Sequence, residues 1–402
     1  MKIFASFSTF ICAASIALAS ESTDAQLKSY PKNLARQHLA TNLLEFDAKT
    51  QVYSPSPLAA DWLDDDVSTG AAAPQGHHFF LVALAEPQLL ANFAVSAAND
   101  TGSVTLYAGD EPAAPGAKSW NLVARKIPIA AINDKTLAKP FSRFAKYLLM
   151  ETEMPQAANW YGLYLYGEKA AIAYHVEQRA KPIDASALFG QPASAATSLN
   201  FSGLYARGRV VYSASREDFI SWQRAVDDNP ETFIKVPASE TESGVVVKFA
   251  DQRAIRKVAI LTDRAAKGRL EIFLTSPAES DVAASDEKKE TFHTSELDKI
   301  SSAVSVEGLT PVTTIQLDGN TPRNGAEFAA VKATQMVLRW TPAISGTPLP
   351  LREINSFDGS SLNDYALASD TSAIGELAVD ESKDARDFKG GKEALPPIGE
   401  FL

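Results

Sequence analysis

Cysteine is almost absent from the 402-residue sequence, since the one thiol, Cys12, lies in an apolar stretch near the start. Without it the chain has no disulfide, no thiolate metal site and no cysteine nucleophile. Basic residues are also few: 38 Lys and Arg stand against 49 Asp and Glu, for a net charge of −11. An acidic chain repels polyphosphate, so we expect no nucleic-acid partner.

Long apolar runs are confined to the N-terminus. The stretch MKIFASFSTFICAASIALAS carries Lys2, then an apolar segment, then Ala17-Leu18-Ala19 ahead of Ser20, which is typical of a secretory signal peptide. Serine and threonine interrupt the segment, and a membrane span needs roughly 20 apolar residues. We therefore expect a signal peptide at residues 1–19, no transmembrane span after its removal, and a secreted or periplasmic protein.

Motifs of the common enzyme classes are missing as well. The sequence contains no G-x-S-x-G, H-E-x-x-H, G-x-x-x-x-G-K-[ST] or G-x-G-x-x-G. The run Asp64 to Asp66 places acids side by side in a loop, whereas a glycoside hydrolase needs two carboxylates facing each other across a cleft. We therefore expect a protein without catalytic activity.

An internal repeat is the strongest feature that the sequence does contain. Residues 62–69 lie over residues 225–232 without a gap, and each member of this pair is rich in aspartate. Further pairs follow in the same order: FLVALAEPQLLANFAVSA with VVVKFADQRAIRKVAILT, GSVTLY with GRLEIF, and AKYLLMET from Ala145 with TQMVLRWT from Thr334. The common order and spacing indicate a duplication.

Both copies consist of short β-rich stretches separated by Gly, Pro, Asp and Asn. Regularly spaced short strands favour a sandwich or a jelly roll, and one possible helix lies in LKSYPKNLARQHLATNLLEF. We expect an all-β fold of two tandem β-sandwiches. The predicted divisions are a signal peptide (1–19), an N-terminal segment (20–44), a first domain (45–180), a linker (181–200), a second domain (201–360) and a disordered tail (361–402).

Four motifs of the second copy occur in a telling order: AVDDNPETF from Ala225, the strand VVVKF with ADQRAIRKVAIL after it, MVLRW, and PLREINSFDG from Pro350. In this order they resemble the discoidin-like family, also called coagulation-factor C-type or galactose-binding-like domains. Through the repeat, the resemblance extends to the first copy. It implies two jelly-roll β-sandwiches in tandem.

The resemblance also implies a structural calcium ion, because the aspartate-rich loop of that family often holds one. The implied ligands are Asp227, Asn229, Thr232 and Glu353. Calcium takes six to eight oxygen ligands, although Asp227 and Asn229 can instead hydrogen-bond their own turn. Asp228 stands where the family has glycine, and aspartate tolerates a left-handed backbone better than most residues. The closing strand of the first copy, GLYLYG from Gly162, has no glutamate at the matching place, which makes its site the weaker candidate.

Sugar-binding members of the family place aromatic and polar side chains on the loops at one end of the sandwich. The resemblance implies a ligand site at Asn159, Trp160 and Tyr161, where a ring would stack on a pyranose. Such a role requires Trp160 or Tyr161 to be substantially exposed in the free protein. The alternative is that Trp160 packs over the rim of its own core.

Together these features predict a secreted, non-catalytic binding or adhesion protein that recognises carbohydrate, such as a cell-surface glycan. One alternative is a structural or protein-protein interaction module of the cell envelope with no sugar site, whose partners would be envelope proteins. Another is an accessory chain that works beside a separate hydrolase. The fold hosts many functions and does not decide among them.

Overall fold

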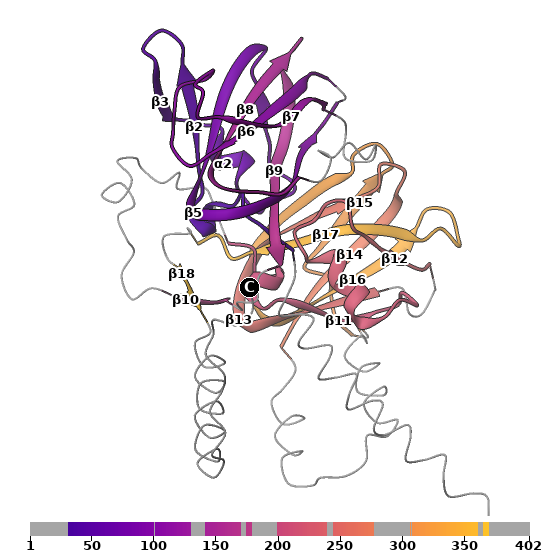
Figure 1. Ribbon diagram of the computed structural model, residues 1–402. Helices are drawn as coiled ribbons and strands as arrows, with labels where there is room; N and C mark the ends of the chain where they lie inside the picture. Colours follow the sequence, from indigo (N-terminus) through magenta and orange to yellow (C-terminus); the bar gives the residue numbers. More distant parts are fainter. Residues whose placement is uncertain are drawn as a thin grey trace, which may run out of the picture.

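A computed structural model describes residues 31–99, 101–129, 141–169, 174–178, 199–238, 244–276, 306, 308–360 and 365–369 (Figure 1). The predicted signal peptide and residues 181–198 of the predicted linker lie outside the described residues. No helix within the described ranges is both long and apolar enough to cross a membrane. The described residues form two units, each built on an antiparallel sheet.

The first unit has the strand order β1-β9-β5-β8-β6-β7, with β2 beside β5, β3 beside β2, and β4 beside β9. Its strands are β1 (Pro31–Asn33), β2 (Asn42–Asp47), β3 (Val52–Pro55), β4 (Ala71–Ala73), β5 (Gly76–Ala97), β6 (Ser103–Gly109), β7 (Asn121–Pro128), β8 (Arg143–Met154) and β9 (Ala158–Lys169). Two short helical turns, η1 (Gln37–Leu39) and α2 (Ala59–Trp62), complete it.

The second unit has the order β12-β17-β13-β16-β14-β15, with β11 beside β13. Its elements are η3 (Leu204–Ala206), β11 (Arg209–Ser213), α4 (Phe219–Trp222), η4 (Gln223–Ala225), β12 (Ile234–Val236), β13 (Gly244–Thr262), β14 (Lys267–Thr275), β15 (Thr313–Asp318), β16 (Arg323–Pro342) and β17 (Leu349–Phe357). This order repeats β4-β9-β5-β8-β6-β7 of the first unit strand for strand. The predicted duplication is therefore present in the topology.

One long strand in each unit passes between two layers. The pairing of β5 with β8 is interrupted between Ala83 and Gln88, and its second half continues beside β9. The pairing of β13 with β16 is interrupted at the equivalent place, between Lys248 and Arg253. Each unit folds around its own apolar core. The expected all-β fold of two jelly-roll β-sandwiches is confirmed.

The N-terminal segment does not form the predicted helix in its described part. Residues 31–44 instead supply β1, η1 and the start of β2, and so belong to the sheet of the first unit. The Asn33 side chain fixes this path, because its Oδ1 accepts hydrogen bonds from the backbone N–H groups of Ala35 (3.0 Å) and Leu165 (2.9 Å). A tertiary contact to β9 thus overrides the helical pattern.

Part of the predicted disordered tail is also a strand. β18 (Tyr365–Ser369) pairs antiparallel with β10 (Tyr174–Gln178), from Tyr174 opposite Ser369 to Gln178 opposite Tyr365. Strands pair through backbone hydrogen bonds, which nearly every residue type can make. The composition of this segment therefore did not predict the strand. The other residues after 360 lie outside the described part of the chain.

The alignment of the two copies needs one correction, in β8 and β16. Leu149 lies opposite Leu81, and Val337 lies opposite Val246, the equivalent of Leu81. Leu149 is therefore equivalent to Val337, whereas the alignment of AKYLLMET with TQMVLRWT places it over Leu338. Each strand has three apolar residues in a row at this point, 148–150 in β8 and 336–338 in β16. They align equally well in either register, although a shift of one residue exchanges the two faces of a strand.

Candidate functional site

Two acidic loops with the same internal hydrogen bonds lie at equivalent places in the units. In the first acidic loop (residues 64–69), the Thr69 hydroxyl donates to Asp64 Oδ2 at 2.6 Å, and it also contacts the carbonyl oxygen of residue 66 at 2.9 Å. In the second acidic loop (residues 227–232), the Thr232 hydroxyl contacts Asp227 Oδ1 and the carbonyl oxygen of residue 229, both at 3.0 Å. The two loops therefore make the same internal hydrogen bonds at positions that the repeat pairs.

The equivalence continues into the segments that precede β2 and β11. Asn33 and Asn200 each accept hydrogen bonds from the backbone N–H two residues on and from an N–H of β9 or β17. His38 and Tyr205 follow these asparagines at the same spacing. Their rings stack, with 4.0 Å between centroids and 20° between planes. Contact between equivalent positions is the property of a twofold interface, so the two units meet like the halves of a symmetric dimer.

Arg36 lies between equivalent carboxylates of the two loops. Its Nε and Nη2 donate to Asp228 at 2.8 and 2.5 Å, and Nε lies 3.1 Å from Asp65 Oδ1. Burial opposes the charge of Arg36, but the Asp228 carboxylate raises its pKa well above the ordinary value. Burial likewise opposes the charge of Asp65, yet His38 and Arg36 lower the pKa of that carboxyl. One buried guanidinium therefore joins both units.

Basic side chains of the second unit reach the first acidic loop in return. Lys257 Nζ lies 2.6 Å from Asp66 Oδ2. Arg323 donates from Nη1 to the carbonyl oxygen of Val67 at 2.8 Å, and from Nη2 to the hydroxyl of Ser96. Each acidic loop thus receives a cation from the opposite unit.

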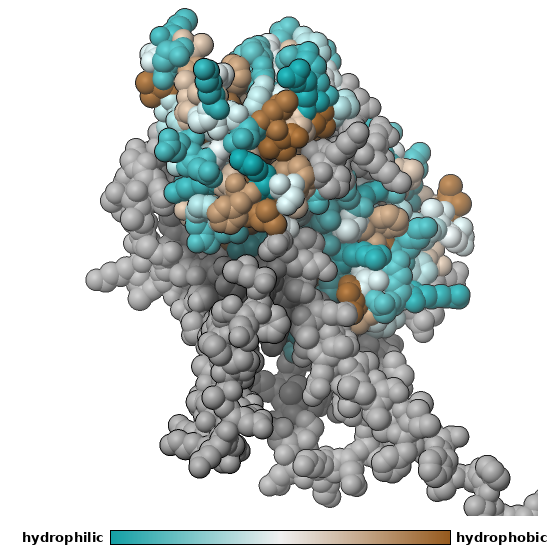
Figure 2. All heavy atoms as spheres, viewed as in Figure 1, coloured by the Kyte–Doolittle hydropathy of each residue, from teal (hydrophilic) through white to brown (hydrophobic). Residues whose placement is uncertain are grey.

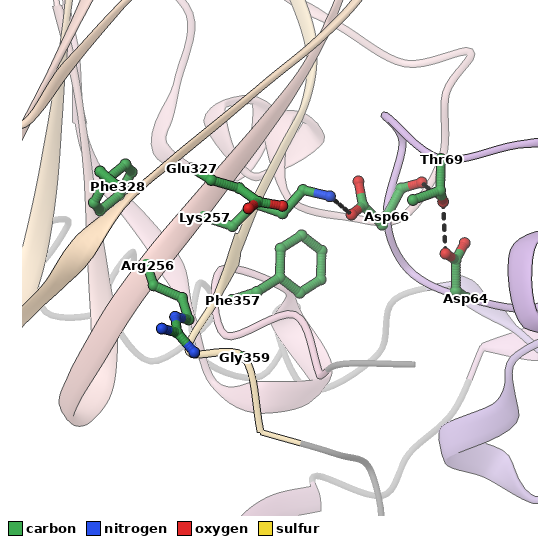
Figure 3. A pocket seen from close by; sticks show the side chains of 9 residues that line it. All are labelled: Asp64, Asp66, Thr69, Arg256, Lys257, Glu327, Phe328, Phe357 and Gly359. Atoms are coloured by element: carbon green, nitrogen blue, oxygen red, sulfur yellow. Dashed lines mark hydrogen bonds and ion pairs between the residues drawn. The ribbon is translucent and has the colours of Figure 1, made fainter. Parts of the chain in front are cut away.

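A pocket of about 460 Å³ lies between the first acidic loop and the second unit (Figure 3). The loop contributes Asp64, Asp66 and Thr69 to its wall. The second unit contributes Arg256, Lys257, Glu327, Phe328, Phe357 and Gly359. The pocket therefore combines carboxylates, cations and aromatic rings, and it requires both units.

Asp64 offers the clearest free hydrogen-bonding group of this pocket. Its Oδ2 accepts from Thr69, whereas its Oδ1 is buried and has no hydrogen-bond partner among the described residues. Burial, followed by the nearby charge of Asp66, raises the pKa of the Asp64 carboxyl well above its ordinary value. A buried polar atom without a partner is costly, and a hydroxyl or amine of a ligand would remove that cost.

The structure brings the predicted calcium ligands together at the second acidic loop. The Asn229 N–H donates to Glu353 Oε1 at 2.7 Å, and the Thr232 hydroxyl reaches both oxygens of Asp227. Glu353 Oε2 is buried without a hydrogen-bond partner in the described chain. Burial raises the pKa of Asp227 to about 8, and burial together with the charge of Asp227 raises that of Glu353. The half-buried carboxyl of Asp227 therefore faces the buried carboxyl of Glu353.

These residues fit a cation by charge, but they offer fewer oxygens than calcium takes. The loop carbonyls of Pro230 and Glu231 accept hydrogen bonds from Arg352, at 3.0 and 3.3 Å. Nowhere in the described residues do three His, Cys, Asp or Glu side chains gather to hold a metal ion. Calcium binding by Asp227 and Glu353 stays a prediction.

The predicted stacking role of Trp160 is wrong. Its side chain is 0% exposed and stacks on Trp62, with 4.6 Å between ring centroids, inside the first core. Tyr161 is half-buried beneath Arg323, whose guanidinium carbon lies 4.3 Å from the ring centroid. Asn159 is exposed on the same strand. Burial of the indole excludes a sugar from it, and ligand binding by Asn159 and Tyr161 stays a prediction.

The comparisons with known proteins leave the family open. The sequence matches no protein-family profile and no curated protein. Similar solved structures include a fucolectin from striped bass (Morone saxatilis) serum, with 10% identity and a TM-score of 0.26 over 85% of this chain and 100% of that one. Allantoicase from Saccharomyces cerevisiae has 9% identity and a TM-score of 0.27 over 84% of this chain and 98% of that one. A pectin-binding carbohydrate-binding module has 14% identity and a TM-score of 0.24 over 34% of this chain and 91% of that one. At these values none bears on what this chain binds.

Sequence reasoning missed the half of the pocket that the second unit supplies. Arg256 and Lys257 lie in the middle of β13, where they read as ordinary exposed positions of a strand. The available signal was the repeat itself, because Lys257 takes the place of Asn92 in the first copy. A basic residue that appears in one copy alone is a candidate for a role between the units.

Proposed function

We propose that this chain is a non-catalytic carbohydrate-binding protein and that its ligand lies in the pocket between the two units. One observation carries the proposal: the buried Asp64 Oδ1 has no hydrogen-bond partner among the described residues, and Asp64 lines a pocket of about 460 Å³. Pockets that bind small ligands commonly have volumes of about 300–1,000 Å³.

The chemistry of the pocket suits a sugar better than an apolar molecule. Hydroxyl groups both donate and accept hydrogen bonds, and the pocket presents the Asp64 carboxyl beside the ion pair of Lys257 and Asp66. Phe328 is half-buried and lines the pocket, so its ring offers apolar contact for the C–H groups of a pyranose. Phe357 also lines the pocket but is 2% exposed, too deeply buried for its ring to stack on a sugar.

The proposal includes a secreted or periplasmic location, for which the pattern of residues 1–19 is the support. A protein in that location meets glycans of cell surfaces and extracellular polysaccharides, and these are the proposed partners. A structural cation at Asp227 and Glu353 also belongs to the proposal, supported by the buried Glu353 Oε2.

A glycan-array screen of the full chain, followed by titration of the best ligand, tests this function. The repeat provides a matched pair of variants, Asp64→Ala and Asp227→Ala, because each removes the same threonine hydrogen bond from an equivalent loop. We expect Asp64→Ala to weaken binding at least tenfold and Asp227→Ala to leave it within twofold. Equal effects of both variants, or no bound glycan, would contradict the proposal.

A structural or protein-interaction module is the second candidate, favoured by apolar side chains at the surface. Figure 2 shows brown patches among the hydrophilic residues of the first unit. Among its residues, Phe144 on β8 is 62% exposed and Leu122 on β7 is 48% exposed. If the double variant Phe144→Ser with Leu122→Ser abolished capture of an envelope protein while no glycan bound, this second function would be the correct one.

A further inference from the structure

Val67 joins the first acidic loop to the second unit through its backbone and its side chain. Its N–H donates to Asn355 Oδ1 at 3.2 Å, and its carbonyl oxygen accepts from Arg323 Nη1 at 2.8 Å. Its side chain is 4% exposed and packs in an apolar cluster with residues of β13 and β17, namely Ala259, Leu261 and Phe357. Both backbone groups and the side chain of Val67 therefore have partners in the opposite unit, so the loop is inserted into that unit.

The second unit leaves room for the next residue of the loop. Gly325 lies on β16, and a Cβ at this position would come within 2.9 Å of Ser68 Oγ and 3.1 Å of Ser68 Cβ. A larger side chain here would push the loop outward, because packed interiors leave few voids. The loop thus lies directly against the sheet of the second unit.

The repeat indicates that this insertion belongs to the first loop and not to the second. Pro230 of the second acidic loop aligns with Val67. Proline has no N–H to donate, and the carbonyl oxygen of Pro230 accepts from Arg352 of its own unit at 3.0 Å. The contact between the units is therefore asymmetric at this point.

The pocket depends on the insertion of Val67. The residues on either side of it bring Asp64, Asp66 and Thr69 to the pocket wall, and the second unit supplies the rest of the lining. Figure 3 shows Asp66 directed at Lys257, whose Nζ lies 2.6 Å from Asp66 Oδ2. If Val67 left its place, these three side chains would move away from the second unit, and the pocket would lose one wall.

Resting on the proposed function, we infer that Val67 is a positioning residue of the pocket and that glycan binding is linked to the docking of the two units. In the docked arrangement the loop is inserted and the pocket is complete, whereas the undocked arrangement lacks the wall that carries Asp64. A glycan that binds only the docked arrangement shifts the equilibrium toward it. Val67 does not line the pocket, so it acts through the position of the loop.

Thiol accessibility tests the insertion without a ligand. In a Cys12→Ser background the full chain has no other thiol, so Val67→Cys, Val52→Cys and Val247→Cys each carry one. Val52 is 57% exposed, whereas Val247 is 0% exposed in the core of the second unit. We expect N-ethylmaleimide to label Val67→Cys about 100-fold more slowly than Val52→Cys, because a buried group reacts only after local opening. Equal rates would overturn the insertion.

Removal of one partner of Val67 tests its positioning role. Asn355→Ala leaves the Val67 N–H without its acceptor and should speed labelling of Val67→Cys about tenfold, as expected for a buried donor that loses its partner. Labelling of Val247→Cys should stay within twofold. Asn324→Ala is the matched control, because the Asn324 side chain donates to Thr321 of its own unit, and it should alter neither rate. If Asn355→Ala speeds both thiols equally, it unfolds the second unit, and the positioning role is overturned.

A titration with the array-selected glycan separates this inference from the function on which it rests. At a concentration of about 100 Kd, the glycan should slow labelling of Val67→Cys about 100-fold, since it binds only the docked arrangement. If a glycan binds and the labelling rate does not change, the carbohydrate-binding function stands and the linkage to docking is overturned. If no glycan binds, the proposed function fails, and the labelling rates with and without Asn355→Ala still decide the role of Val67.

Discussion

His38 and Tyr205 occupy equivalent positions in the two units and stack on each other, with ring centroids 4.0 Å apart. Both rings also contact Asp65: His38 Nδ1 lies 3.0 Å from Asp65 Oδ2, and the Tyr205 hydroxyl donates to the same oxygen at 2.5 Å. The two units of this duplicated chain therefore contact each other as the subunits of a twofold dimer do. The first acidic loop is largely buried and the second partly buried at this interface, and the pocket forms beside the first.

Arg36 should contribute more to stability than any exposed ion pair of the chain. Arg36→Met leaves Asp228 without its cation and Asp65 with His38 alone, and removal of one partner from a buried pair costs about 3–5 kcal/mol. Lys126→Met is the control, because Lys126 and Glu153 form an exposed pair worth less than about 1 kcal/mol. Urea denaturation measures both. Equal losses for the two variants would show that the Arg36 network does not hold the units together.

Trp160 should act as a core residue. Trp160→Ala removes a ring that is 0% exposed and stacked on Trp62, and we expect it to lower the free energy of unfolding by about 3–5 kcal/mol. Trp160→Phe should be milder and should bind the array-selected glycan within twofold of the unaltered protein. A Trp160→Phe protein of unchanged stability that no longer binds the glycan would restore the stacking role.

The carboxyl pair of Asp227 and Glu353 should make stability fall as pH rises. Both carboxyls have a raised pKa in the folded protein, about 8 for Asp227 because of burial, against about 4 in an unfolded chain. The folded state therefore holds the proton more tightly, and this stabilisation is complete below pH 4 and lost as pH approaches 8. Its slope is at most about 1.4 kcal/mol per pH unit for each proton.

Comparison with Glu353→Gln isolates this contribution from other titrating groups. We expect the difference in unfolding free energy between the variant and the unaltered protein, measured in urea at pH 5, 6.5 and 8, to shift steadily in favour of the variant. A difference that is independent of pH would mean that the pair carries no extra proton in the folded state.

Calcium, if it binds the same pair, should replace the proton. An ion that binds only the folded state at a concentration of 100 Kd stabilises it by about 2.7 kcal/mol. Millimolar calcium should then raise the melting temperature of the unaltered protein at pH 8 and leave that of Asp227→Ala unchanged. If calcium shifts neither protein, the calcium prediction is wrong and a shared proton is the better account of Glu353 Oε2.

Two features of the sequence predicted the fold: short β-rich runs and an ungapped internal repeat. Short β-rich runs with turn residues between them predict strands without knowledge of their partners, and the ungapped repeat predicts that two units share one topology. The failures came where a distant contact decides the outcome. The side chain of Asn33 accepts a hydrogen bond from the backbone N–H of Leu165 on β9. The sequence of the N-terminal segment alone does not predict that hydrogen bond.

The candidate site was harder to predict for the same reason. The sequence favoured the second acidic loop because the closing strand of the first copy has no glutamate at the place of Glu353. The actual partner of the first acidic loop, Lys257, comes from the opposite unit, and a contact between units leaves no trace in the spacing of either copy. Arg36 and Asp228 are likewise 192 residues apart in the sequence.

A crystal structure of the full chain with its array-selected glycan shows where the ligand binds. We expect the sugar to lie between the first acidic loop and the second unit, with a hydroxyl within hydrogen-bond distance of Asp64 Oδ1. A sugar bound elsewhere, for example beside Asn159 and Tyr161 on the first unit alone, would contradict this expectation.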